Sequence, residues 1–482
     1  MTAVNRLKLH YLYLARFVLE AQSAFTIASG LSDGAFDNLV VRDANHLPAI
    51  PATTLAGILR HMYREKFGKE SETELFGFQE KAKGTASRVE ISWGVVHDKD
   101  DQPAEQLEVQ ITDPVLQFLV QDHPIYRDRV RINDRSVADH QAKYDVTVVP
   151  KGCRFSFEIC LWSAEADSDE WERLLDLIKS PELRLGASVR SGLGRFACVR
   201  LHEKVFNLKN TDDYKAFSLL PSDLAYTDDW TNKLQQINND NPLCELRLSL
   251  EPEDFWRFGQ GNRSLTDTKD KPSDALPYTE PVISWKRVDD KKVESAFLKQ
   301  QHVLIPGSAV KGTIRHRFFY HYARQLLSEP IDDDVVKEKA LAATNQIFGF
   351  PADIVDGTTM GRAGVVYFTD CYLARDKFST EDVQQMTHTS IDRFTGGVRS
   401  GALFTEELIW KSEFGLIVSF DSKESESFDV MTRNALQWTF DDLIQGRLAL
   451  GAASSRGHGY FSGDIEWRGN PLWPVEREES AA

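Results

Sequence analysis

The feature that most constrains the fold of this 482-residue chain is an internal repeat. IPATTLAGILR at 50–60 recurs as IPGSAVKGTIR at 305–315, and LFGF at 75–78 recurs as IFGF at 347–350. The segment from 132 that holds Asp134-Arg135 matches the segment from 391 that holds Asp392-Arg393. LGASVRSGLGRF at 185–196 matches LGAASSRGHGYF at 450–461. Four matches in one order, at nearly constant spacing, indicate a tandem duplication.

The pattern within each half predicts an α+β domain. A strand of alternating apolar and polar residues leads to the Ile-Pro turn, which starts a helix; further strands, a second helix, a glycine-rich loop and a last strand follow. That order is typical of a ferredoxin-like β-α-β-β-α-β core with insertions. We predict a first domain over 1–205, a polar linker over 206–242, a second domain over 243–468 and a C-terminal tail over 469–482.

Composition narrows the class of protein. A net charge of −16 opposes uniform nucleic-acid binding, yet residues 302–325 carry four Lys or Arg and no acid, so basic stripes remain. No apolar run is long enough to span a bilayer. The five cysteines are scattered without a CxxC pair, which argues against a zinc ribbon or disulfide scaffold and predicts a cytoplasmic protein.

The repeated segments resemble the RAMP superfamily, the repeat-associated proteins of CRISPR systems. Its marks are an Ile-Pro-Gly-Ser-x-x-Lys-Gly-x-x-Arg segment, an Ile-Asp-Arg thumb segment and a C-terminal glycine-rich loop, and residues 305–315 match the first mark fully. More narrowly, the chain resembles backbone subunits of type III effector complexes, in a fused, type III-D-like form. The resemblance implies two tandem ferredoxin-like domains of the RNA-recognition-motif type with thumb hairpin insertions.

The same resemblance implies partners and an activity. Such a subunit binds a CRISPR guide RNA, and its thumb flips a nucleotide out of the guide–target duplex. Many copies cleave the target RNA near that nucleotide with one aspartate and a divalent metal. The other expected partners are type III subunits: further RAMP backbone and cap subunits, the large polymerase-like subunit and the small subunit. No membrane partner is expected.

RNA contacts are expected at the repeated segments. Lys311 and Arg315 lie four residues apart on a helix whose N-terminus offers unpaired N–H groups to phosphate. In the first copy Ala56 replaces the lysine, so 50–60 is equally consistent with RNA binding and with a packing corner. Glycine-rich loops free N–H groups for phosphates, and the thumb arginines face RNA by resemblance. The predicted RNA-binding residues are Arg60, Arg135, Arg190, Arg195, Ser308, Lys311, Arg315, Arg393, Arg456 and His458.

The candidate catalytic residue of the first half is Asp37. The family pattern has an aspartate, a small polar residue and then Pro-Val, and residues 37–40 read Asp-Asn-Leu-Val. Asp37 would hold Mg²⁺ or another divalent metal, or orient the attacking 2′-hydroxyl. Asp33, four residues earlier, is the reserve candidate.

The second half departs from this pattern. Pro281-Val282 aligns well, but the catalytic position then falls on Thr279. Either this half does not cleave, or Asp274 or Glu280 substitutes.

Two alternatives remain open. The chain could be a non-catalytic RNA-binding scaffold, with cleavage by another subunit. It could also be a guide-processing endoribonuclease that uses a histidine such as His97 or His140.

Overall fold

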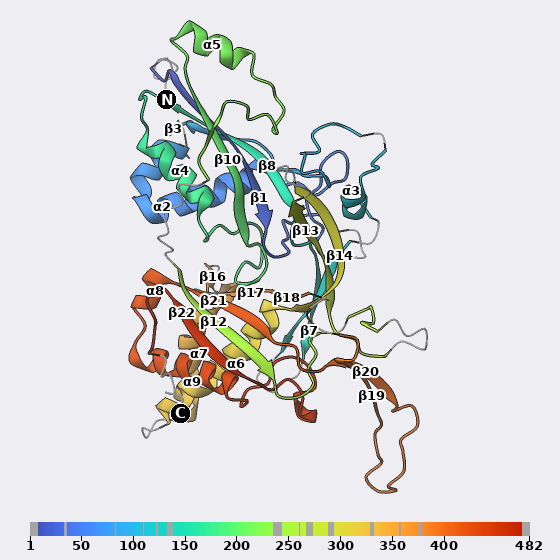
Figure 1. Cartoon of the computed structure of the whole chain (residues 1–482). Helices are drawn as coiled ribbons and strands as arrows, with labels where there is room; N and C mark the ends of the chain where they lie inside the picture. The colour runs from blue at the N-terminus through green and yellow to red at the C-terminus, as the bar shows by residue number, and fades with distance from the viewer. Residues whose placement is uncertain are drawn as a thin grey trace, which may run out of the picture.

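The computed structural model describes residues 8–32, 36–81, 83–108, 110–121, 124–132, 138–234, 243–259, 261–266, 273–287, 294–327, 332–355, 358–374, 377 and 379–474. Two sheet-and-helix domains lie one above the other in Figure 1, the first built from the blue-to-green part of the chain and the second from the lime-to-red part. Within these ranges no helix is long and apolar enough to cross a membrane.

The first sheet is antiparallel and runs in the order β10–β1–β8–β4. Its strands are β1 (Tyr11–Ala21), β4 (Val89–Ile91), β8 (Arg154–Ser163) and β10 (Phe196–Asn207), with β11 (Thr231–Asn232) beyond β10 and β5 (Val95–Val96) also on β8. Of these four main strands, the last in the chain (β10) therefore lies beside the first (β1). The third (β8) lies between the first and the second (β4). This is the ferredoxin-like order that the sequence predicts.

The second sheet repeats that order as β22–β12–β21–β17. Its strands are β12 (Leu243–Pro252), β17 (Val366–Thr369), β21 (Phe414–Asp421) and β22 (Phe461–Arg468). The prediction of two tandem α+β domains is confirmed. Residues 366–373 form two strands, β17 and β18 (Cys371–Leu373), because β17 pairs with β21 while β18 pairs with β14 (Glu294–Ile305).

Helices cover one face of each sheet and bury its apolar side chains. Helices α2 (Ala52–Phe76) and α4 (Asp169–Lys179) pack on the first sheet around Phe17 and Phe157, whose rings stack at 5.3 Å. Helices α6 (Gly307–Leu326), α7 (Asp333–Phe348) and α9 (Val430–Ile444) pack on the second. Helix α7 was not predicted; it corresponds to the last turns of α2, which kinks at Gly68.

Residues 206–234, placed by the sequence in a polar linker, pack on the other face of the first sheet. Helix α5 (Thr211–Ser218) and Trp230 cover Leu12 and Leu14 of β1. Arg16 fixes the segment by donating to the carbonyls of Pro221, Asp223 and Tyr226. These contacts are long-range, which is why a polar composition did not reveal them.

The two domains are joined through strands. Hairpin β13 (Thr279–Arg287)–β14 reaches up beside the first domain (Figure 1), where Ile283 and Ala296 enter its core. In return β9 (Ser191–Gly192), from the first glycine-rich loop, extends the second sheet by pairing in parallel with β17.

Four hairpins and short helices complete the described part of the chain. The hairpins are the two thumbs, β6 (Tyr126–Ile132)–β7 (Ala138–Thr147) and β19 (Val383–His388)–β20 (Phe404–Ile409), and two shorter ones, β2 (Phe78–Glu80)–β3 (Lys83–Thr85) and β15 (Gly349–Val355)–β16 (Thr358–Ala363). The short helices are α3 (Pro114–Leu119), α8 (Ser422–Glu426) and the 3-10 turn η2 (Ser454–Arg456). The second thumb projects away from the body at the lower right of Figure 1.

Candidate functional site

Asp37 lies exposed at the base of the first thumb and is tied to its second strand. Its carboxylate accepts the N–H of Asp145 at 3.1 Å, and the Asp145 carboxylate accepts the N–H of Asp37 at 2.9 Å. The carbonyl of Asn38 then accepts both the N–H and the hydroxyl of Thr147. The loop is therefore fixed, and two carboxylates lie side by side.

Asp274 holds the same position in the second domain. Its carboxylate accepts the N–H of Thr405 at 2.8 Å, and its own N–H donates to the Thr405 hydroxyl at 3.2 Å. The carbonyl of Ala275 accepts the N–H of Glu407, as Asn38 accepts that of Thr147.

The neighbouring bonds fix this alignment. Leu39 accepts the N–H of Ser29 at 2.8 Å, and Leu276 accepts the N–H of Gly261 at the same distance. Asp274, rather than Thr279, is thus the structural equivalent of Asp37. The Pro-Val alignment misled because Pro281 and Val282 lie in β13, beyond the loop that these hydrogen bonds define.

Glu280 has a structural role that excludes it as a catalytic group. It is 2% exposed, and Arg127 of the first thumb binds it through Nε at 2.6 Å and Nη2 at 2.8 Å. Arg127 also donates to Asp370 at 2.7 Å, and Tyr372 donates to Glu280 at 3.1 Å. Burial opposes the charge of Arg127, but Asp370 and Glu280 outweigh it and raise its pKa well above the usual value. Asp33 lies outside the described residues.

The tip of the second thumb is a turn organised by Asp392. Its carboxylate accepts the N–H groups of Phe394 and Thr395 and the Thr395 hydroxyl, and these bonds lower its pKa. Arg393 is exposed beside it, and Phe394 is 96% exposed. Two further apolar side chains of the thumb, Val398 and Leu403, are each 67% exposed. The tip of the first thumb, with Asp134 and Arg135, lies outside the described residues.

The corner at 305–315 is covered by the first domain. The Gly307 N–H, at the helix start, donates to Asp370 at 2.8 Å, and a Cβ on Gly307 would come within 2.9 Å of the Gly192 Cα. The first N–H of the helix is thus bonded to a carboxylate, which corrects the expectation that this end faces phosphate. Ser308 is half-buried beside it.

Three cations gather next to this corner. Burial, and then the charges of Arg190 and Arg315, lower the pKa of Lys311 to about 8. Arg190, in the glycine-rich loop of the first domain, donates to the carbonyl of Gly364 and to the Tyr367 hydroxyl in the second domain. Its guanidinium carbon also lies 4.9 Å from the centre of the Tyr367 ring. Its main contacts are therefore between domains.

Arg315 and its first-domain equivalent, Arg60, both brace the following helix. Arg315 donates to Asn345 of α7 at 2.8 Å. Arg60 binds Glu72 and donates to the carbonyl of Gly77 at 3.0 Å, while its side chain remains 45% exposed.

Arg195 is half-buried, and its backbone N–H donates to the hydroxyl of Ser23.

The second glycine-rich loop is bound to the second thumb. Arg456 donates to Glu406 at 2.9 Å, and Arg257 and His388 bind the same carboxylate, which is fully buried. Burial acts to raise the pKa of Glu406, but these cations lower it. His458 is 6% exposed, so it is not available on the surface as a predicted RNA contact.

Sequence reasoning missed Asp145, Arg127 and Asp370. If the sequence match between the segments from 132 and from 391 is continued to the second strand of each thumb, Asp145 aligns close to Thr405. Nothing in the sequence pairs Arg127 with Asp370, because the two lie in different domains.

The two candidate histidines differ. His97 is 2% exposed and bonds Asp101 and Ser156, each at 2.7 Å, and burial lowers its pKa. His140 lies exposed on β7. All five cysteines are free thiols.

The two ferredoxin-like domains, with their thumb hairpins and matched glycine-rich loops, define a duplicated α+β protein. The RAMP superfamily model matches residues 18–197 and 291–462, more than half of the chain. The chain therefore belongs to the RAMP superfamily.

Searches among known proteins add a remote likeness. No curated protein matches, whereas 193 chains of solved structures do. One of these belongs to a cryo-EM structure of type III-B Cmr-β bound to cognate target RNA. It has 16% identity and a TM-score of 0.30 over 42% of this chain and 64% of that chain. A likeness this low adds nothing to the assignment, which depends on the family match.

Proposed function

We propose that this chain is a guide-RNA-binding backbone subunit of a type III CRISPR complex and that it cleaves complementary target RNA. Membership of the RAMP superfamily and the resemblance of the motifs support the first part. The observation that carries the second is the repeated carboxylate. Asp37 and Asp274 are both exposed, and matched hydrogen bonds hold both at the base of a thumb.

RNA cleavage by these groups needs only positioning and proton transfer. The 2′-hydroxyl beside the scissile phosphate would attack the phosphorus and lose its proton, while the bond from phosphorus to the 5′-oxygen breaks and that oxygen takes up a proton from water. The products would be a 2′,3′-cyclic phosphate and a 5′-hydroxyl. A carboxylate fixed by backbone N–H groups can accept the proton of the 2′-hydroxyl or hold that hydroxyl in line. The rigid attachment of Asp37 and Asp274 to the thumbs suits this task, since the thumbs would also position the duplex.

A divalent metal fits these positions. Mg²⁺ takes one or two carboxylates and completes its shell with substrate phosphates and water. Asp37 and Asp145 offer two neighbouring carboxylates, and Asp274 offers one beside a hydroxyl. The described residues contain no group of three or more His, Cys, Asp or Glu that could hold a metal, so RNA would complete the shell. When bound, the metal would neutralise the reacting phosphate.

The guide RNA is proposed to pass the cations beside the domain junction. Arg190 and Arg315 both repel the charge of Lys311, and within the described ranges none of the three is ion-paired with a carboxylate. A bound phosphate would neutralise this repulsion.

Neighbouring RAMP subunits are proposed to bind at both ends of the chain. The first glycine-rich loop contacts the second domain, where Gly192 meets Asp370. The equivalent Gly457 of the second loop has open space around its Cα. At the other end β4 is an edge strand of the described sheet, and Trp93 beside it is 51% exposed. The loop at Gly457 and the edge at β4 are therefore equivalent to the two surfaces that contact each other between the domains, and each is exposed in this chain.

The test replaces each carboxylate by its amide in a complex reconstituted with guide RNA, Mg²⁺ and labelled target. Asp37→Asn and Asp274→Asn keep the hydrogen-bond acceptor and remove the charge. Each should slow one set of cuts by about 10²- to 10⁴-fold and leave target binding unchanged. The double variant should leave the target intact. Glu466→Gln, on the exposed outer edge of β22, is the matched control.

The outcomes separate the rivals. Unchanged products from the double variant would refute the assignment of both aspartates. A wild-type complex that binds target without cutting it would instead support the scaffold alternative. Guide processing by His97 is disfavoured, since this histidine is buried and bonded on both ring nitrogens. We expect all of this to occur in the cytoplasm.

A further inference from the structure

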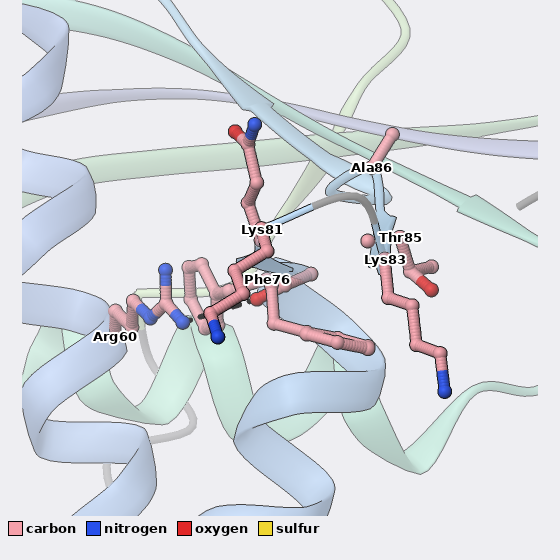
Figure 2. Close-up of a pocket in the computed structure, with 10 residues that line it drawn as sticks. Arg60, Phe76, Lys81, Lys83, Thr85 and Ala86 are labelled. Carbon is pink, nitrogen blue, oxygen red and sulfur yellow. Dashed lines mark hydrogen bonds between the residues drawn. The ribbon is translucent and has the colours of Figure 1, made fainter.

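The first domain contains a basic pocket that neither the repeat nor the motifs predict. It has a volume of about 430 Å³ and lies between the end of α2 and hairpin β2–β3. Figure 2 shows Arg60 of α2 on one side, Lys83 of the hairpin on the other, and Lys81 and Phe76 between them. None of the ten lining residues is acidic.

Gly77 lets the hairpin pack against the end of the helix, and Gly84 lets the two strands of the hairpin pack closely on each other. Gly77 has φ 72°, and a Cβ there would approach the Thr85 carbonyl oxygen at 2.2 Å. A Cβ on Gly84 would approach the Phe78 carbonyl oxygen at 2.8 Å. The hairpin is thus closely packed on the helix end, which places its lysines beside Arg60 rather than leaving them on a detached loop.

The charges of the pocket are available to a ligand. Lys81 and Lys83 are exposed, and neither forms an ion pair within the part of the chain that the structure describes. Arg60 binds Glu72 and the Gly77 carbonyl with part of its guanidinium, and 45% of its side chain remains exposed. Two ammonium groups and one guanidinium around one cavity favour an anion.

The duplication indicates which anion. Arg60 is the equivalent of Arg315, which lies one helical turn after Lys311. Position 56, the equivalent of Lys311, is Ala56. The first domain therefore lacks the lysine of the second and has two lysines from another element beside the same arginine.

We propose that Arg60, Lys81 and Lys83 bind a backbone phosphate of single-stranded RNA, and that the hairpin thereby replaces the lysine missing at position 56. This inference rests on the proposed RNA-binding function. A phosphodiester suits the site better than a carboxylate, because its two unesterified oxygens can bind the guanidinium and an ammonium at once. The exposed ring of Phe78 at the rim gives an adjacent base a surface on which to stack.

The experiment titrates the full chain with a fluorescent single-stranded RNA across a salt series. Lys81→Ala/Lys83→Ala should weaken binding at low salt by about tenfold. It should also reduce the slope of log K against log salt by about 0.7 for each phosphate that the variant no longer neutralises. Lys81→Arg/Lys83→Arg should restore both values.

Lys337→Ala/Lys339→Ala is the matched control, since these exposed lysines of α7 have the same spacing and remove the same charge. It should bind RNA as the wild type does. If the wild type binds RNA and the pocket variant has the same affinity and slope, the pocket inference is overturned while the proposed function stands. If the wild type itself binds no RNA, the proposed function fails. If labelled polyglutamate binds the wild type but not Lys81→Ala/Lys83→Ala, while both bind RNA equally, the pocket is assigned to an acidic protein segment and the inference is overturned.

Discussion

The two glycine-rich loops have the same backbone and different neighbours. Four matched positions have left-handed φ angles: Gly186 and Gly451 (92° and 91°), Ser188 and Ala453 (57° and 65°), Gly192 and Gly457 (107° and 89°), and Gly194 and Gly459 (77° and 80°). Yet a Cβ on Gly192 would meet Asp370 at 1.8 Å, whereas one on Gly457 would meet nothing within 4 Å. The backbone of each loop is therefore set by its own domain, and what the loop contacts is set by position in the chain.

The thumbs differ in the same way. Arg127 pairs across the first thumb with Val146, and the corresponding position of the second thumb is Met386, opposite Glu406. Asp370, which Arg127 binds, corresponds to Trp93, since their following residues, Cys371 and Gly94, both pair with the isoleucine of the Ile-Pro turn. The internal junction is ionic, whereas the equivalent positions in the two domains hold the apolar side chains of Met386 and Trp93.

The largest expected effect comes from breaking the ionic junction. Arg127→Ala leaves the buried carboxylates of Glu280 and Asp370 without their cation, which should cost about 3–5 kcal/mol of unfolding free energy. Denaturant unfolding measures this cost. Met386→Ala, at the equivalent position of the second thumb, should cost about 1 kcal/mol or less, since this half-exposed side chain has no charged partner to leave behind. Equal losses of unfolding free energy in the two variants would show that the ion pairs of Arg127 do not stabilise the junction.

The next largest effect distinguishes the cost of a strained loop backbone from the cost of a lost contact between the domains. Gly192→Ala and Gly457→Ala both place a side chain at a left-handed φ, which costs about 1–2 kcal/mol each. Only Gly192→Ala also pushes a methyl group into Asp370, which should add about 1–3 kcal/mol. Thermal or denaturant unfolding of the pair gives the difference directly. A larger loss for Gly457→Ala would contradict the comparison.

The sequence predicted what depends on local pattern and missed what depends on packing between domains. Strand alternation and the repeated Ile-Pro turn predicted the α+β topology, and the repeated glycines predicted two equivalent loops. The loop at Asp37 was also found, because its residues are contiguous. The sequence could not place Asp370 at the start of α6, or Arg190 on Tyr367, since each contact joins residues more than 60 positions apart. Arg190 and Arg456, predicted to bind RNA from motif position alone, also form contacts within the protein that the sequence did not indicate.

The third effect concerns Lys311 and pH. In the free protein its pKa is lowered to about 8, chiefly by burial. A bound phosphate favours the protonated lysine, so it raises this pKa. Affinity for RNA should therefore be constant well below pH 8 and fall as pH rises above 8, by up to about tenfold per pH unit until the pKa of the bound state is reached.

Titrations of labelled RNA from about pH 7 to about pH 9 test this dependence. Lys311→Arg should remove it, because arginine stays charged throughout that range. A wild-type affinity that does not change across pH 8 would mean that Lys311 does not contact phosphate.

The smallest expected effect comes from restoring the repeat. Ala56→Lys recreates in the first domain the lysine–arginine pair that Lys311 and Arg315 form in the second. The gain in RNA affinity should be only about two- to threefold, because Glu72 already offsets part of the charge of Arg60 and the hairpin lysines supply charge nearby. The same substitution made in Lys81→Ala/Lys83→Ala should recover more of the affinity, since it then replaces the charge that the hairpin no longer supplies. His61→Lys, on another face of α2, controls for added charge alone. If it raises affinity as much as Ala56→Lys does, position 56 has no special relation to the RNA.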